Sequence, residues 1–181
     1  MTRRLRITGG SLAGRRIECP PGKIRPAMDR MRESLFSILG NLDATSFLDL
    51  FSGSGVMALE AVSRGAVRGV CVERDWRKKE VALRNVGLAG GTIELVISPV
   101  EGYLRTGSEK FDYVFLDPPF AYHDKSRLLR RLSESGAIIA GGVVIIHHPG
   151  DELEPPPELR CYDTRRYGGS HLWFYQFAND R

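Results

Sequence analysis

Apolar and polar positions alternate along the chain in a pattern that predicts strands and helices in turn. From Ser46 onward, short apolar runs typical of buried strands are followed by segments with the three-to-four-residue spacing of amphipathic helices. This repetition of strand and helix predicts a parallel sheet with helices on both faces. The predicted strands are 47–51, 67–73, 92–98, 111–117 and 141–148, and the predicted helices are 55–65, 75–90, 100–105 and 126–135.

The residues before this repetition follow a different pattern. Two short alternating runs, 5–8 and 15–19, flank a Gly-rich segment and predict a β-hairpin. After a Pro-rich loop, the spacing of apolar residues predicts a helix with Asp29 as its N-cap. Gly40 is expected to end this helix.

The end of the chain predicts a further pair of strands. Residues 160–178 read as two strands joined near Gly168, so an antiparallel pair is expected to close the sheet. The length favours a single domain over 1–181. Within it, 1–28 form a basic hairpin and loop, and 29–181 form the core that carries the site.

Composition limits the class of protein. No apolar run approaches the roughly 18 residues of a membrane span, and the basic start lacks the apolar stretch of a signal peptide. Cys19, Cys71 and Cys161 are odd in number and far apart, which favours a reducing cytoplasm with the thiols as small core residues. His147 and His148 have no third ligand nearby in the sequence, so we interpret them as strand-end packing and expect no metal site.

Positive charge is concentrated near the start of the chain. Residues 1–32 hold nine Lys and Arg and two acids, a net charge of +7, whereas the whole chain has +4. A local basic region predicts a polyanion partner, and the alternative is a solvated arm that contacts nothing. Arg15, Arg16 and Arg25 are the predicted phosphate contacts. Arg30 is a further substrate-binding candidate, although its place at the start of a helix also suits a structural role.

A Gly-rich turn in "FLDLFSGSG", residues 47–55, joins the first core strand to its helix. Gly53 and Gly55 allow the backbone to approach a ligand at the helix N-terminus. Asp49 interrupts an otherwise apolar strand, and Glu73 ends the next strand, where an acid can accept hydrogen bonds from ribose hydroxyls. A nicotinamide-dependent oxidoreductase shares these features, but its fingerprint fits here only in the terminal-Ala form.

The segment "YVFLDPPF", residues 113–120, ends the fourth core strand in a stiff corner, because proline fixes its own φ and keeps the preceding residue extended. The Asp117 carboxylate and the Pro118 carbonyl, held by Pro119, can accept both N–H bonds of an amino group on a nucleobase. This directs the nitrogen lone pair toward a methyl donor, while Phe120 offers a face on which an extruded base can stack. An oxidoreductase has no need for such a corner. The alternative is a rigid turn with a capping Asp.

The motifs "FLDLFSGSG" and "DPPF" resemble those of S-adenosylmethionine-dependent amino-methyltransferases of the seven-stranded Rossmann-like class. The motifs "RITGGSLAGRRI", "PPG", "RPAMDRMRESLFSIL", "VERD" and "YGGSHLWFYQF" are similar to those of the bacterial RsmD family, the 16S ribosomal RNA guanine-N2 methyltransferases. The resemblance covers nearly the whole chain. It implies an α/β fold with a Rossmann-like, seven-stranded, mostly parallel sheet, a C-terminal antiparallel strand pair and an N-terminal β-hairpin extension. It also implies a cytoplasmic enzyme acting on 16S rRNA or the small ribosomal subunit.

The resemblance assigns roles to individual residues. Those implied for the S-adenosylmethionine site are Asp49, Ser52, Gly53 and Gly55 at the methionine end, Glu73 at the ribose, Arg74 beside it, and Ser98 toward the adenine. Those implied for the guanine are Asp117, Pro118, Pro119 and Phe120, with Tyr122 at the edge of the base pocket.

Two other functions stay open at this point. A DNA or RNA adenine-N6 methyltransferase uses the same chemical corner, but 181 residues leave little room for a target-recognition domain. A catalytically silent module that binds the donor and RNA belongs to a different class, and the intact "DPPF" argues against it.

Overall fold

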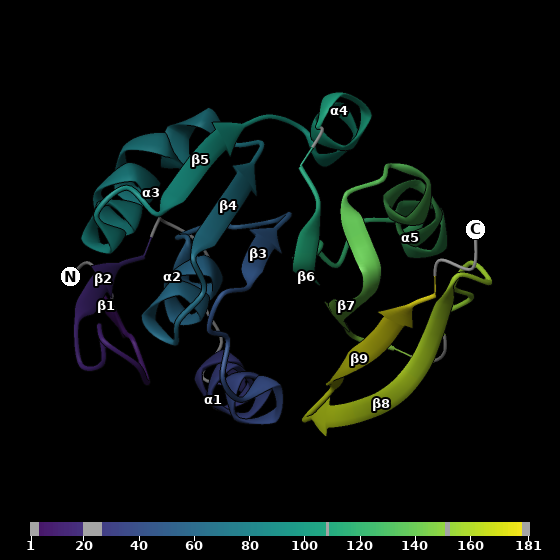
Figure 1. Cartoon of the computed structure of the whole chain (residues 1–181), viewed down its shortest axis with the longest axis horizontal. Helices are drawn as coiled ribbons and strands as arrows, with labels where there is room; N and C mark the ends of the chain where they lie inside the picture. Colours follow the sequence, from purple (N-terminus) through teal and green to yellow (C-terminus); the bar gives the residue numbers. More distant parts are fainter. Residues whose placement is uncertain (1–3, 20–26, 108, 151–152, 179–181) are drawn as a thin grey trace.

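A seven-stranded mixed sheet forms the centre of the computed structural model, which describes residues 4–19, 27–107, 109–150 and 153–178 (Figure 1). The strand order is β5-β4-β3-β6-β7-β9-β8, and β1 and β2 form a separate antiparallel hairpin. The five strands from β3 to β7 run parallel, and β9 runs antiparallel to both β7 and β8. The strands are β1 (Arg4–Arg6), β2 (Arg16–Glu18), β3 (Ser46–Asp49), β4 (Arg68–Glu73), β5 (Ile93–Ile97), β6 (Phe111–Leu116), β7 (Ile138–His148), β8 (Leu159–Tyr167) and β9 (Ser170–Phe177).

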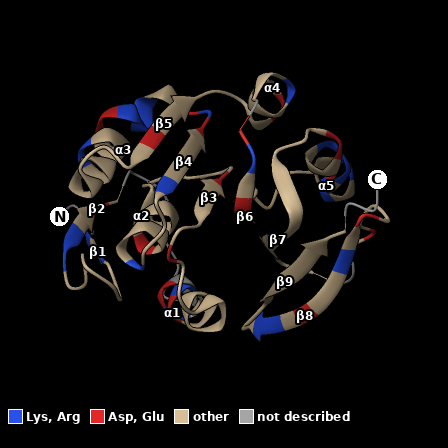
Figure 2. Cartoon of the chain, viewed as in Figure 1, with Lys and Arg blue, Asp and Glu red and all other residues tan. Residues whose placement is uncertain are grey.

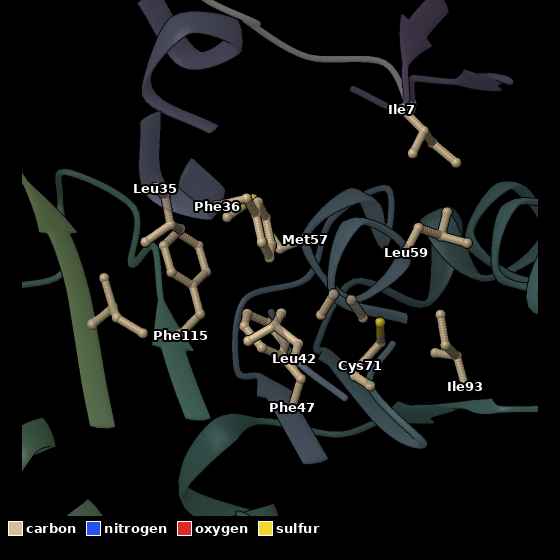
Figure 3. Packing of buried hydrophobic residues seen from close by; sticks show 14 of the residues in the cluster. Ile7, Leu35, Phe36, Leu42, Phe47, Met57, Leu59, Cys71, Ile93 and Phe115 are labelled. Atoms are coloured by element: carbon tan, nitrogen blue, oxygen red, sulfur yellow. The ribbon is translucent and has the colours of Figure 1, made fainter. Parts of the chain in front are cut away.

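Helices cover both faces of this sheet, as its continuous apolar strands require. One face packs against α1, α2 and α3 in a core that includes Phe36, Phe47 and Met57 (Figure 3). The other face packs against α4 and α5 in a second core around Phe111 and Leu129. The helices are α1 (Ala27–Leu39), α2 (Val56–Ser63), α3 (Lys79–Val86), α4 (Val100–Thr106) and α5 (Lys125–Glu134), and short 3-10 turns η1 (Trp76–Lys78) and η2 (Gly87–Ala89) flank α3. The predicted α/β class, antiparallel strand pair and N-terminal hairpin are confirmed.

The strand order creates a crevice beside β3. Its two neighbours, β4 and β6, continue the chain in opposite directions across the sheet, and all three strands are parallel. Their C-terminal ends therefore meet at one edge, where open α/β sheets bind ligands. Asp49 lies level with Cys71 on β4 and Phe115 on β6, so Glu73 and Asp117 each follow two residues beyond this level.

The N-terminal hairpin lies along α2 and α3. Its turn is anchored at the C-terminal end of α2, where the Ser11 amide donates to the Ser63 carbonyl at 2.7 Å. Its other end reaches the N-terminal end of α2 through Asn85 of α3. The side-chain amide of Asn85 donates to the Glu18 carbonyl at 2.8 Å and to the carbonyl of Ser54, just before α2, at 2.9 Å. The hairpin turn is thus at the opposite end of α2 from the Gly-rich loop.

Two local predictions are wrong. Helix α1 begins at Ala27, so Asp29 lies in its first turn and is not the N-cap. There it forms an ion pair with Arg32 at 3.2 Å and favourably complements the helix dipole. Cys19 and Cys71 are buried as expected, but Cys161 is exposed, because it points to solvent from the outermost strand, β8.

Among the helices of the described residues, none is both long and apolar enough to cross a membrane.

Candidate active site

A cleft of about 840 Å³ opens over the C-terminal ends of β3, β4 and β6. It is built from the loops that follow these strands, from the start of α4, and from the turn between β8 and β9. Both sequence motifs therefore contribute to one cavity, the first through Leu50 and Phe51, although Gly55 and Tyr113 are 58 positions apart in the sequence. The lining residues are Met31, Leu50, Phe51, Glu73, Arg74, Asp75, Lys78, Pro99, Val100, Glu101, Asp117, Pro118, Pro119, Phe120, Tyr122, His147, Tyr167, Gly168, Gly169 and Ser170.

Asp49 is the least paired carboxylate of the site. It ends β3 with 1% of its surface exposed, and its Oδ1 accepts only a long bond of 3.4 Å from the Phe51 amide. Among the described residues, its Oδ2 has no hydrogen-bond partner, and neither does the Oγ of buried Ser52. Burial raises the pKa of Asp49 well above its usual range, and the nearby charges of Asp117 and Glu73 raise it further.

The two predicted glycines shape the loop that follows Asp49. Gly53 and Gly55 have φ values of 53° and 79°, in the left-handed region that favours glycine. A Cβ on Gly55 would lie 2.8 Å from the Val86 side chain, so a larger residue at this position would also clash with Val86. The Gly53 amide donates to Glu73 Oε2 at 3.0 Å, which ties the loop to the end of β4.

Glu73 lies in the cleft as predicted, but the protein itself already binds its carboxylate. Besides the Gly53 amide, the Asp75 amide donates to Oε1 at 2.8 Å, and the Lys78 ammonium lies 3.1 Å from Oε2. A carboxylate has about four acceptor positions, and these three donors leave about one of them for a ribose hydroxyl. Arg74 is exposed at the rim of the cleft.

The Asp-Pro-Pro-Phe corner follows directly after β6. Pro118 is buried and Pro119 is exposed, and the Pro119 carbonyl accepts the Tyr122 amide at 2.8 Å to close the turn. Within the described parts of the chain, no backbone donor reaches the Pro118 carbonyl. Phe120 keeps 44% of its surface exposed at the mouth of the cleft. The corner therefore presents a carboxylate, a carbonyl and an aromatic ring to the same cavity.

Tyr122 extends the aromatic wall of this cavity. Its ring meets Phe51 edge to face with centroids 5.8 Å apart, and its hydroxyl donates to Glu101 Oε1 at 2.6 Å. Burial and the Glu101 hydrogen bond raise the pKa of Tyr122 to about 12. Tyr122 thus lines the cleft, and its predicted place at the edge of a base pocket stays a prediction.

Other predicted residues lie away from the cleft. Arg15 and Arg16 are exposed near the hairpin turn, and Arg30 is exposed on α1. Arg25 lies outside the described residues. Ser98 does not line the cleft, because its hydroxyl turns to the Pro99 carbonyl at 3.0 Å.

Sequence reasoning missed His147, which lines the cleft and lies 2.9 Å from Asp117. Its position near the end of a predicted strand could have indicated a role in the site. This required knowing that β7 lies next to β6 in the sheet. In the described part of the chain, no group of three or more His, Cys, Asp or Glu residues is arranged to hold a metal ion.

This cleft, on this sheet topology, places the chain among the Rossmann-like methyltransferases. Residues 5–176 match the model of the family described as Conserved hypothetical protein 95. The chain belongs to this family, and its resemblance to the RsmD family is thereby confirmed.

Relatives and solved structures agree with this assignment. Ribosomal RNA small subunit methyltransferase D of Escherichia coli strain K12 is 35% identical over 137 residues, which cover 73% of this chain and 68% of the relative. Putative rRNA methyltransferase YlbH of Bacillus subtilis strain 168 is 30% identical over 159 residues, covering 84% and 86% of the two chains. The structure of putative methyltransferase yhhF from Escherichia coli superimposes with a TM-score of 0.90 at 27% identity, covering 97% of this chain and 99% of that one.

Proposed function

We propose that this enzyme transfers a methyl group from S-adenosylmethionine to the exocyclic N2 amino group of a guanine in 16S rRNA of the small ribosomal subunit. The observation that carries this proposal is the Asp-Pro-Pro-Phe corner. It places an acceptor pair and an aromatic ring in the same cleft as the Gly-rich loop. The names of the Escherichia coli and Bacillus subtilis relatives, which refer to rRNA methylation, support an rRNA substrate.

The unpaired atoms of the Gly-rich loop fit the methyl donor. S-adenosylmethionine is cationic at its sulfonium and its ammonium, and Glu73 and Asp117 place acidic side chains in the lining of the cleft. Within the described parts of the chain, Asp49 Oδ2 and Ser52 Oγ are buried without hydrogen-bond partners, and leaving such groups unpaired costs about 1–3 kcal/mol each. A ligand that donates hydrogen bonds to them recovers this cost. We therefore assign Asp49, Ser52, Gly53 and Gly55 to the methionine end of the donor and Glu73 to its ribose.

The corner after β6 activates the acceptor. The donor supplies a methyl group whose bonding electron pair stays on sulfur when the amine attacks, and the methylated nitrogen then gives up one proton. The Asp117 carboxylate and the Pro118 carbonyl accept the two N–H bonds of the amine, which directs its lone pair away from the ring of the base. Phe120 stacks on the guanine, and Tyr122 borders it.

The N-terminal basic residues are the proposed RNA contacts. Arg6 and Arg16 lie directly opposite each other in the β1–β2 pair, and like charges in such positions are destabilising. Both are exposed, and Figure 2 marks Lys and Arg on this hairpin and on β8. RNA phosphates neutralise such pairs. Because the hairpin turn lies at the far end of α2 from the Gly-rich loop, we assign Arg15 and Arg16 to RNA remote from the modified base.

The test is a transfer assay with methyl-labelled donor. Small ribosomal subunits and naked 16S rRNA, both from cells lacking the modification, are incubated separately with the protein, and the product is digested and analysed by mass spectrometry. We expect a single N2-methylguanosine. Labelled N6-methyladenosine would instead indicate the adenine methyltransferase, and donor binding by calorimetry without transfer to either substrate would indicate the silent module.

A further inference from the structure

His147 connects the corner after β6 to the outer strands of the sheet. It is the penultimate residue of β7, and 6% of its surface is exposed. Its Nδ1 lies 2.9 Å from Oδ1 of Asp117, and its Nε2 lies 2.8 Å from the hydroxyl of Ser170, the first residue of β9. One imidazole ring therefore joins the proposed acceptor-activating carboxylate to the β8–β9 hairpin.

The hydrogen-bond partners determine where the ring carries a proton. The Ser170 hydroxyl lies 3.1 Å from the Tyr167 carbonyl and within reach of His147 Nε2. A carboxylate oxygen only accepts, so its short contact with Nδ1 requires an N–H group at Nδ1. The single ring proton then lies on Nδ1, and the Ser170 hydroxyl donates to Nε2, which is the closer of its two acceptors.

This contact makes the two oxygens of Asp117 different. Oδ1 is held by His147, while no hydrogen bond of the described residues ends on Oδ2. The side chain of Asp117 remains partly exposed, and the residue lines the cleft. A charge-assisted hydrogen bond of this kind is short and directional, so it restricts rotation of the carboxylate and leaves Oδ2 to accept from a ligand.

We propose that His147 is a positioning residue for methyl transfer, which holds Oδ1 of Asp117 so that Oδ2 accepts an N–H bond of the guanine amino group. Ser170 orients the imidazole from the opposite side. This inference rests on the proposed function. It adds a requirement that the Asp-Pro-Pro-Phe motif does not contain, namely a hydrogen-bond donor supplied by the neighbouring strand.

Three variants test the role in the transfer reaction. His147→Leu removes both hydrogen bonds of the ring, and His147→Asn keeps an N–H donor near the position of Nδ1. Ser170→Ala keeps the imidazole ring but removes its hydrogen bond at Nε2. We expect His147→Leu to lower kcat by about 10–100-fold, a range typical of a displaced reacting group. KM for subunits and the donor Kd should change little. His147→Asn should recover most of kcat, and Ser170→Ala should show a smaller loss than His147→Leu.

His148→Leu is the matched control, because His148 is also buried, at the next position of β7, but stacks on Trp173 with centroids 6.0 Å apart. Its kcat should stay close to that of the wild type. An unchanged kcat in His147→Leu, or an Asn variant no better than the Leu variant, would overturn the proposal, since packing alone would then explain the residue.

A spectroscopic measurement separates this proposal from the proposed function. Nitrogen NMR of protein labelled in histidine reports whether Nδ1 of His147 carries a proton, and it needs neither donor nor RNA. We expect a protonated Nδ1 whose signal shifts when Asp117 is replaced by Asn. A His147 Nδ1 without a proton in the wild-type protein overturns the positioning role even if rRNA is methylated. A protonated Nδ1 in a protein that methylates no rRNA would instead refute the proposed function alone.

Discussion

Two buried carboxylates, Glu60 within α2 and Asp49 at the end of β3, differ in how completely they are paired. Glu60 has no exposed surface, and its oxygens accept the Thr8 amide at 2.9 Å, the Thr8 hydroxyl, the Arg32 guanidinium at 2.9 Å and the Arg64 guanidinium. Asp49 is almost equally buried, yet among the described residues one of its oxygens has no hydrogen-bond partner. Burial alone therefore does not distinguish these two acids, whereas unfilled hydrogen-bonding capacity does, and this difference supports the proposed role of Asp49 in donor binding.

The Glu60 group joins three parts of the chain. Thr8 follows the first strand of the hairpin, Arg32 lies on α1 and also donates to the Arg6 carbonyl at 2.9 Å, and Arg64 follows α2. Every member gains its partner from within the protein. Arg32 is thus a structural residue, and its charge is neutralised internally rather than being available to RNA.

The largest expected effect is on stability. Glu60→Ala leaves the Arg32 guanidinium buried without a carboxylate, and breaking a buried pair in this way should lower the free energy of unfolding by about 3–5 kcal/mol. Urea unfolding measures this change, with Glu33→Ala on the exposed face of α1 as the matched control. A loss no larger than that of the control would remove the distinction between the two acids.

The next effect is on catalysis. Asp117→Ala should lower kcat by on the order of 10²–10³-fold, the effect of losing one hydrogen-bond partner of the transition state. Donor affinity, measured by calorimetry, should change much less. Asp163→Ala on β8 is the control, because that acid pairs with Arg165 far from the cleft in the sheet order. Near-normal single-turnover rates in the Asp117 variant would mean that the corner is not the active site.

Glu73 tests the comparison between paired and unpaired acids most sharply. It lines the cleft as a donor-binding acid would, but its carboxylate already accepts hydrogen bonds from within the protein, as that of Glu60 does. If it also holds the donor ribose, Glu73→Ala should weaken donor binding by about 1–3 kcal/mol. Lys78→Ala removes its cationic partner and should leave donor affinity equal or higher, since the carboxylate is then free to accept from the ribose. Unchanged donor affinity in the Glu73 variant would place this acid with Glu60 as a structural residue.

Asp49 should limit the stability of the ligand-free protein. Its folded-state pKa is raised by burial, whereas the unfolded value is about 3.9. Between these two values the folded state binds more protons than the unfolded state, so stability falls as the pH rises through this window. Asp49→Asn should therefore flatten the pH dependence of the melting temperature above pH ~4 and weaken donor binding. Parallel pH curves for wild type and variant would contradict this reading of Asp49.

The smallest effect concerns the hairpin that Glu60 anchors. Replacing Arg15 and Arg16 with Ala should flatten the slope of log affinity for RNA against log salt by about 1.5 units, because each phosphate contact contributes roughly 0.7–0.9. Donor binding should stay intact. Superimposable salt plots for wild type and the double variant would show that the hairpin turn is not an RNA-binding surface.

Features that depend on neighbouring residues could be predicted from the sequence. Hydrophobic spacing predicted the order of strands and helices, and the two glycines and two prolines indicated the loop and the corner, because their backbone preferences act locally. Membership of the methyltransferase class followed from these motifs. The ends of elements were less accurate, as with the helix assigned to begin at Asp29, because a helix can extend beyond the residue that looks like its cap.

Contacts between side chains that are distant in the sequence depend on the three-dimensional fold. His147 and Asp117 are thirty positions apart, and their contact depends on β7 lying next to β6 in parallel register. A lone histidine at a strand end has the same sequence pattern whether it packs or holds a carboxylate. The same holds for Glu73, whose pairing with Gly53 requires β3 and β4 to be neighbours. Strand order and register are global properties, so the partners of these groups could not be obtained from periodicity along the chain.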